Sequence, residues 1–491
     1  MRRKILYALS LAAVIALFAV VAFQSWGYDD EMFNFNHVER AESLGDLIKF
    51  INGTDIHPYG MYVINYIMLK ALGSWPAVKA ASGVFCALCL WLFWYVVSRN
   101  ITEKSALVLS YILLCLNPTL LLWCTSVRWY TYFTPMVCAM TLLVMNAGSK
   151  TLKGSWLWAI YFLTCLVMFH VNYISSVIII ISFLFMLHGR KEFLRSEWKY
   201  VVVFGALSLC LVSYQAYILL TVHYINGKGF TFPPKFSVGA AQNYLCGQAV
   251  VPVSPEGIAF ILANIIMLIA FLKYAVKILK HRGNSFLVIT YAALMITCPG
   301  NSTSSGARNF SVLSPETGMF LTNVYSEIKS RLLKMFVLLL YAAGTATGIY
   351  NVVTHTNTSK ATYDMPYVAI ISYADTFDPE RKAMFISDFG VLDYHAKKIY
   401  SNATSTASDS LIDDVRKWKG KIIAVQTHNP GSRYGRHYAE YLSFLAELEN
   451  SKNCTVKEIG RDKYAWFKQK FSKDLPEYYA QVYFIDNGDK Q

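Results

Sequence analysis

The stretch that decides the fold is GYDDEMFNFNHVERAESLGDLIKFINGTDIHPYGM, residues 27–61. It follows an apolar segment at 5–23 and precedes another run of apolar and aromatic residues. Three consecutive carboxylates, Asp29, Asp30 and Glu31, therefore lie where a membrane span meets water. Charged groups beside hydrocarbon are costly and usually have a function. We interpret the rest of the chain as the scaffold that holds this loop at the membrane surface.

The composition is that of a membrane protein with many spans. Of the 491 residues, 55% are hydrophobic and 15% are charged, whereas a soluble protein carries about 25% charged residues. The net charge of +14 is explained by Lys and Arg in cytoplasmic loops. No motif of a nucleic-acid-binding protein accompanies it, so membrane lipids rather than nucleic acid are the expected surroundings.

The hydropathy pattern predicts about eleven transmembrane helices, several of them shorter than the roughly 20 residues of a full span. The first is 5–23, and the others are 78–98, 105–123, 131–147, 155–170, 173–188, 200–221, 257–276, 285–299, 310–326 and 333–352. Residues 32–50 and 58–73 predict two helices in the membrane interface. Basic residues gather on alternate connections, which predicts a cytoplasmic N-terminus and outer loops at 26–77 and 222–256.

A change of composition after residue 352 predicts two domains. Residues 1–352 form the all-α polytopic membrane domain, and residues 353–491 form a soluble extracytoplasmic α/β domain. In the second domain the pattern predicts strands at Tyr367–Ala374, Ala383–Asp388 and Lys421–Gln426, and helices at Val391–Tyr400 and Tyr438–Glu449.

Two motifs lie in the first outer loop. Asp29-Asp30-Glu31 is either a general base or carboxylate clamp or the solvated start of a helix. In Asp55-Ile56-His57-Pro58-Tyr59, His57 could bind phosphate, donate a hydrogen bond or bind a metal. The alternative is that Asp55 or His57 caps the following helix, which Pro58 would begin.

Three further sites carry polar groups at outer ends of spans. Arg128 and Tyr130 belong to SVRWYTY, residues 126–132, where the planar guanidinium suits a phosphate. The alternative is an interfacial aromatic belt with a snorkelling Arg. His170 and Asn172 form either a pocket or a polar turn between two spans. Arg308 is either a second phosphate-binding group or a charge at a helix end.

In this order the motifs resemble the GT-C superfamily of membrane glycosyltransferases, among them the protein O-mannosyltransferases and the bacterial aminoarabinose transferases. Asp30-Glu31 matches the acidic pair of the first outer loop. The segment 55–59 matches Asp-x-His-Pro-Pro, with Tyr59 in place of the second Pro. Arg128 with Tyr130, and Arg308 followed by Pro315, match the later basic elements loosely, and Asn309 stands where the family has Tyr. The resemblance covers the chain up to about residue 350.

The resemblance implies an inverting glycosyltransferase with a polyprenyl-phosphate-linked sugar as donor and a glycan, lipid or protein as acceptor. Asp30 would be the base, oriented by Glu31 or Asp29. Arg128, with Arg308 or His57, would stabilise the leaving phosphate. The remaining pocket residues would be Asp55, Tyr130, His170 and Asn172.

The setting implied is a bacterial inner membrane, with a periplasmic C-terminal domain and a role in cell-envelope glycan or lipopolysaccharide modification. No closed set of metal ligands is present in the sequence, although the carboxylates could hold a divalent cation. The alternative class is a polytopic transporter, or a flippase or ligase for lipid-linked glycans. A transporter would place charged residues within its spans and often has symmetric halves.

Overall fold

The computed structural model describes residues 2–24, 29–54, 57–149, 153–218, 220–221, 254–297, 310–354, 367–387, 390–405, 415, 417–427, 438–449, 453–461 and 478–486. The chain divides into two compact units. One unit consists of residues 1–24 with 34–352, and the other of residues 25–33 with 353–491.

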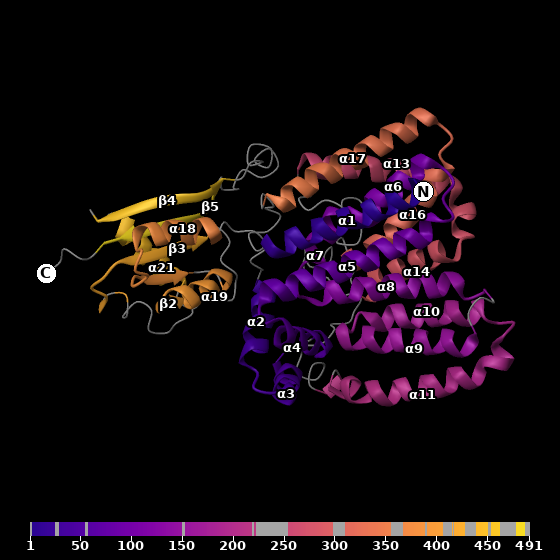
Figure 1. Ribbon diagram of the computed structural model, residues 1–491, viewed down its shortest axis with the longest axis horizontal. Helices are drawn as coiled ribbons and strands as arrows, with labels where there is room; N and C mark the ends of the chain where they lie inside the picture. The colour runs from indigo at the N-terminus through magenta and orange to yellow at the C-terminus, as the bar shows by residue number, and fades with distance from the viewer. Residues whose placement is uncertain are drawn as a thin grey trace. The chain divides into compact units, whose positions relative to one another are not determined.

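The first unit is helical throughout its described part (Figure 1). Its elements are α1 (Arg2–Gln24), α2 (Asp29–Arg40, which begins in the other unit), α3 (Leu44–Thr54), α4 (Gly60–Leu72), α5 (Trp75–Ser98), α6 (Lys104–Cys115), α7 (Pro118–Trp123), α8 (Trp129–Asn146), α9 (Gly154–Val171), α10 (Ser175–Gly189), α11 (Leu194–Ile218), α13 (Pro255–Leu279), α14 (Arg282–Thr297), η2 (Ser311–Leu313), α16 (Ser314–Glu327) and α17 (Arg331–Val353).

The predicted polytopic helical fold is confirmed. Seven segments in the described ranges are long and apolar enough to cross a membrane: α1, α5, α6 with α7, α9, α11, α13 and α17. Eleven spans would also require α8, α10, α14 and α16, and that count stays a prediction. Helices α5, α8, α9 and α10 run side by side, and α3 and α4 lie at one end of them (Figure 1).

Two predicted helices are interrupted, each by a capping group. The expected span 105–123 breaks between α6 and α7, where Asn117 Oδ1 accepts the backbone N–H groups of Thr119 and Leu120 at 2.9 and 3.3 Å. Pro118 is the first residue of the new helix, a position that Pro favours. The expected interfacial helix 32–50 is two helices, α2 and α3, because the Ser43 hydroxyl accepts the N–H of Asp46 at 3.2 Å.

The two ends of the helical unit differ in charge. Trp75 Nε1, at the start of α5, donates to Glu39 Oε1 of α2 at 2.7 Å, so α5 begins beside α2. This helix has 24 residues, a length of about 36 Å, and its other end lies at the far side of the unit. There Lys334 pairs with Glu103 at 2.5 Å. Arg99, Lys104, Lys277 and Lys280 also lie at this second end. We call the first end the α4 end and the second the basic end.

Ion pairs hold several helices together at the basic end. Lys277 near the end of α13 pairs with Glu327 at the end of α16 at 2.7 Å. Arg190 forms a buried ion pair with Glu197, and its Nη1 donates to the backbone oxygen of Ser149 at 2.8 Å. Trp158 Nε1 also donates to Glu197, at 3.0 Å. These contacts join the C-terminal ends of α8 and α10 with the N-terminal parts of α9 and α11.

The C-terminal domain contains a mixed five-stranded sheet of order β2-β1-β3-β5-β4. Its elements are α18 (Tyr367–Phe377), β1 (Met384–Ser387), α19 (Gly390–Ile399), β2 (Asn402–Ser405), β3 (Ile422–Thr427), α21 (Tyr438–Glu449), β4 (Cys454–Arg461) and β5 (Tyr478–Ile485). Strand β1 pairs in parallel with β2 and β3, with Met384 opposite Asn402 and Ile422. Strand β5 runs antiparallel to β3 and β4. This confirms the α/β class.

One strand prediction in this domain is wrong. Residues 367–374 belong to helix α18 rather than to a strand. Ile370 and Ala374 are buried one helical turn apart, whereas Tyr373 is exposed. A short apolar run does not distinguish a strand from a buried helix by its pattern alone. The strands β1 and β3 and the helices α19 and α21 lie where the sequence predicts them.

Candidate functional site

The centre of the candidate site is the turn between α7 and α8, residues 124–128. The carbonyl oxygen of Val127 accepts hydrogen bonds from two buried amides. Asn34 Nδ2 of α2 lies at 2.6 Å and Asn65 Nδ2 of α4 at 2.9 Å. Because the two amides come from different helices, they hold the backbone next to Arg128 in a fixed place.

Arg128 is buried at the start of a long helix. It is the residue before α8 and is only 5% exposed. Its Nη1 donates to the hydroxyl of Tyr62 in α4 at 3.4 Å. The positive end of the helix dipole and the guanidinium charge lie together here, and both favour an anion. The arrangement is suited to a phosphate group.

A buried hydrogen-bonded network supports this turn from behind. The hydroxyl of Tyr132 in α8 donates to Asn65 Oδ1 at 2.5 Å. It also lies 3.0 Å from Ser82 Oγ of α5. All three side chains are buried, and fully satisfied buried networks rigidify their surroundings. The network therefore connects α4, α5 and α8 around the Arg128 turn.

The acidic motif forms the first turn of α2. Asp29, Asp30 and Glu31 are its first three residues, and the side chains of the two aspartates lie outside the described part of the chain. Glu31 is 1% exposed. Together with Asn34, Phe35 and Val38 it forms one buried stripe, at the spacing of a helix face.

The second motif packs against the end of α9. His57 is half-buried, and Asp55 lies outside the described residues. The Tyr59 ring meets the His170 ring edge-on at 5.6 Å. A β-carbon placed on Gly60 would lie 2.8 Å from the carbonyl carbon of His170, so this contact requires glycine. Burial, with a smaller effect of the nearby Tyr214, raises the pKa of Tyr59 above its ordinary value.

The helix after this motif begins later than predicted. The sequence predicts Pro58 as its first residue, but α4 starts at Gly60. Pro58 has no regular secondary structure and Tyr59 lies in a turn, after which Gly60 packs closely against the end of α9. The motif therefore positions α4 and, through α4, the network around Val127.

Three other predicted pocket residues have structural contacts. His170 Nδ1 lies 2.9 Å from the backbone oxygen of Leu166 in its own helix. Asn172 Oδ1 accepts the N–H of Ile174 at 2.9 Å, which is the polar turn that the sequence also allowed. Tyr130 is 1% exposed and packs between Trp123 and Trp129, with ring centres at 5.0 and 4.1 Å. A pocket role for these residues stays a prediction.

The remaining predicted residues are not placed by the structure. Arg308 and Asp55 lie outside the described residues, as do residues 222–253 of the second outer loop. Within the described ranges, no three His, Cys, Asp or Glu side chains gather as metal ligands would. The finding applies to Glu31 and His57, whose side chains are described. It does not apply to Asp29, Asp30 or Asp55, whose side chains lie outside the described part of the chain.

The sequence analysis missed the amides that build the site. Asn34, Asn65 and Gln215 are each at most 1% exposed. Gln215 Nε2 of α11 donates to the Tyr173 hydroxyl and lies 3.5 Å from Asn52 Oδ1 of α3. Asn65 lies within the apolar run Met61–Leu69, where an amide without partners is costly. A single amide inside an apolar helix was therefore the available signal.

Comparisons with known proteins agree with this architecture. No family model and no curated protein matches the chain. Among solved structures, ArnT from Cupriavidus metallidurans in the apo state matches with a TM-score of 0.54 at 9% identity, over 99% of each chain. The crystal structure of the same protein bound to undecaprenyl phosphate matches with a TM-score of 0.51 at 10% identity, over 97% of each chain.

The chain has the ArnT fold. This similarity is one of fold, and it agrees with the family resemblance that the motifs indicated. The match covers nearly the whole of both chains and therefore includes the small C-terminal sheet domain as well as the helices.

Proposed function

We propose that this protein is a membrane glycosyltransferase that moves a sugar from a polyprenyl-phosphate-linked donor to an acceptor at the outer membrane face. The observation that carries the proposal is the buried Arg128 at the start of α8, which follows a carbonyl, that of Val127, held by amides from α2 and α4. The fold supports it, because the similar ArnT was solved with undecaprenyl phosphate bound. A buried guanidinium at a helix start suits such a lipid phosphate.

The reaction we propose is a single displacement with inversion at the anomeric carbon. The acceptor hydroxyl attacks that carbon, the bond from the carbon to the phosphate oxygen breaks, and the polyprenyl phosphate leaves. Asp30 takes the proton of the attacking hydroxyl, and Glu31 or Asp29 orients the acceptor. Arg128 stabilises the negative charge that develops on the leaving phosphate, with Arg308 or His57 as further donors.

The Asn34 amide reaches Val127, the residue before Arg128. Asp55, Tyr130, His170 and Asn172 would complete the substrate pocket. The sugar, and the choice between a glycan, lipid or protein acceptor, are left open.

The charge difference between the two ends supports an orientation. The basic end carries Arg99, Lys104, Lys277, Lys280 and Lys334, and Lys and Arg gather on the cytoplasmic side of membrane proteins. The N-terminus of α1 would then be cytoplasmic, and the α4 end would face outward. In a bacterial inner membrane, the C-terminal domain would be periplasmic and the acceptor a cell-envelope glycan or lipopolysaccharide.

One observation favours the transporter alternative. Besides Glu197, which pairs with Arg190, two carboxylates are buried in the described part of the helical unit: Glu256 at the start of α13 and Glu316 in α16. Buried carboxylates within spans often mark ion pathways. However, each has a neutral hydrogen-bond partner, since Asn351 Nδ2 donates to Glu256 at 2.6 Å and Thr141 Oγ1 to Glu316 at 3.3 Å. These pairs join neighbouring helices, so they also have a structural explanation.

The test is radiolabelled sugar transfer from polyprenyl-phosphate donors by the purified chain. Asp30→Asn removes the base and should reduce transfer at least 100-fold. Asp46→Asn is the matched control, because Asp46 is an exposed residue of α3 and should keep activity. Full activity of Asp30→Asn would remove Asp30 as the base. Movement of the lipid-linked sugar across the membrane without its transfer would favour the flippase.

A further inference from the structure

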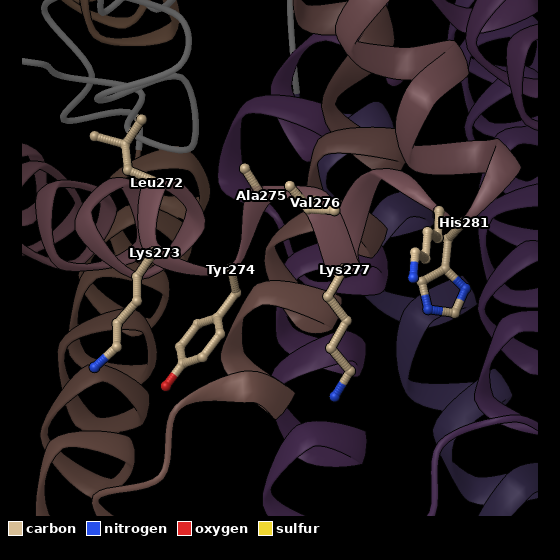
Figure 2. Close-up of a pocket in the computed structure, with 8 residues that line it drawn as sticks. Leu272, Lys273, Tyr274, Ala275, Val276, Lys277 and His281 are labelled. Atoms are coloured by element: carbon tan, nitrogen blue, oxygen red, sulfur yellow. The ribbon is translucent and has the colours of Figure 1, made fainter.

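Helix α13 is kinked near the basic end, and a pocket lies at the kink. Tyr274 has φ −116° and ψ 15°, outside the helical range, so α13 consists of two helical segments. The pocket has a volume of about 740 Å³. It is lined by the polar side chains of Lys273, Tyr274, Lys277, Lys280 and His281 and by Leu272, Ala275 and Val276. Figure 2 labels all of these except Lys280.

The pocket is strongly basic. Three lysines line it, and the carboxylate paired with one of them is Glu327, 2.7 Å from Lys277 Nζ. The side chain of Lys277 remains 66% exposed, so this ion pair leaves it accessible. Lys273 Nζ lies 5.5 Å from the centre of the Tyr274 ring. Lysine ammonium groups beside the Tyr274 hydroxyl suit an anionic ligand that also accepts a hydrogen bond from an uncharged donor.

The same pocket is also lined by exposed apolar side chains. Leu272 is 68% exposed and Val276 79% exposed. In Figure 2 the side chains of Lys273, Tyr274 and Lys277 point to one side of α13, and those of Leu272 and Val276 point to the other. Basic and apolar side chains therefore line one pocket near the end of a membrane span. A free phosphate would contact only the basic ones.

We propose that the α13 kink pocket binds the headgroup of an anionic phospholipid at the cytoplasmic membrane surface. The three lysines contact the phosphate, Tyr274 contacts the polar glycerol region, and Leu272 and Val276 border the acyl chains. Basic pockets beside transmembrane helices commonly bind such headgroups. The pocket is at the opposite end of the helical unit from Arg128, so this proposal does not depend on the proposed transferase function.

The experiment measures lipid binding to the purified full-length chain by native mass spectrometry. The probes are dioctanoyl phosphatidylglycerol, dioctanoyl phosphatidylcholine and inorganic phosphate. We expect phosphatidylglycerol to bind at least tenfold more tightly than the other two. Lys273→Gln with Lys277→Gln and Lys280→Gln should weaken its binding at least tenfold. The double variant Lys273→Gln with Lys280→Gln keeps the ion pair between Lys277 and Glu327 and serves as a second test if the triple variant does not fold. It should weaken phosphatidylglycerol binding severalfold.

The matched control changes three exposed basic residues at the same end of the molecule that do not line the pocket: Lys191→Gln, Arg195→Gln and Lys199→Gln. It should bind phosphatidylglycerol within twofold of the unchanged protein. An equal loss in the control would mean that general charge attracts the lipid, and would overturn the proposal. So would full displacement by inorganic phosphate, or unchanged binding by both pocket variants.

Discussion

Replacing Asn65 with alanine tests the network that holds Arg128. Asn65 is completely buried, and the change removes its bond to Val127 O at 2.9 Å and the bond it accepts from Tyr132 at 2.5 Å. Asn34 still reaches Val127, and Ser82 still reaches Tyr132. The cost is therefore close to the net value of two hydrogen bonds, about 2 kcal/mol. A loss of that size lowers the melting temperature of a chain of this length by about 2 °C.

The assay is thermal unfolding of the purified protein in detergent, followed by tryptophan fluorescence. Asn146→Ala is the matched control, because Asn146 lies in the last turn of α8, where its exposed amide bonds Leu142 O at 2.8 Å. An exposed substitution should change the free energy of unfolding by less than about 0.5 kcal/mol. We also expect Asn65→Ala to weaken donor use, because the backbone beside Arg128 loses one of its two amides. Equal melting temperatures for the two variants would refute the reasoning.

Three further changes have predicted outcomes in the same unfolding assay. Gly60→Ala should lower the melting temperature, because the new methyl group would press on the backbone at the end of α9. Arg190→Gln should destabilise the chain by about 3–5 kcal/mol, since it leaves the buried carboxylate of Glu197 without its charge partner. Burial acts to raise the pKa of Glu103, but hydrogen bonds from Lys334 and Ser105 outweigh it and hold that pKa below its ordinary value. The lowered pKa contributes stability above about pH 4.3 that is lost as the pH falls through the folded pKa, so Lys334→Met should melt below wild type at pH 6, and the difference should shrink as the pH falls.

Each of these predictions has a control within the chain. Gly53→Ala should be neutral or stabilising, because nothing lies within 4 Å of a β-carbon placed there. Arg195→Gln removes an exposed arginine and should change stability little. Lys329→Met removes an exposed lysine at the basic end and should show the same pH dependence as wild type. The predictions fail if Gly60→Ala, Arg190→Gln or Lys334→Met behaves like its control.

The sequence predicted the helices better than their breaks. Long apolar runs such as 78–98 and 333–352 determine membrane helices because the bilayer requires that length. The break at Asn117 depends on one amide turning back to two backbone N–H groups, and helical spacing does not show it. Residues 367–374 were assigned to a strand because a short apolar run fits both periods.

Within the candidate site, the sequence located the charged groups but not the groups that hold them. Arg128 and the acidic turn of α2 are visible because charges at span ends are costly. Asn34 and Asn65 come from different helices, 93 and 62 residues away from the carbonyl they share. Only the packing of α2 and α4 against the Arg128 turn brings them together. The spacing of residues along the sequence does not show which distant residues are brought together in this way.

Undecaprenyl phosphate binding tests the central claim most directly. Purified wild-type protein, Arg128→Ala and Arg99→Ala would each be titrated with this lipid in phosphatidylcholine nanodiscs. Arg99 is the control, because it is exposed and lies at the basic end. We predict that wild type and Arg99→Ala bind alike and that Arg128→Ala binds at least tenfold more weakly. Equal binding by all three proteins would contradict the assignment of the α4 end as the donor phosphate site.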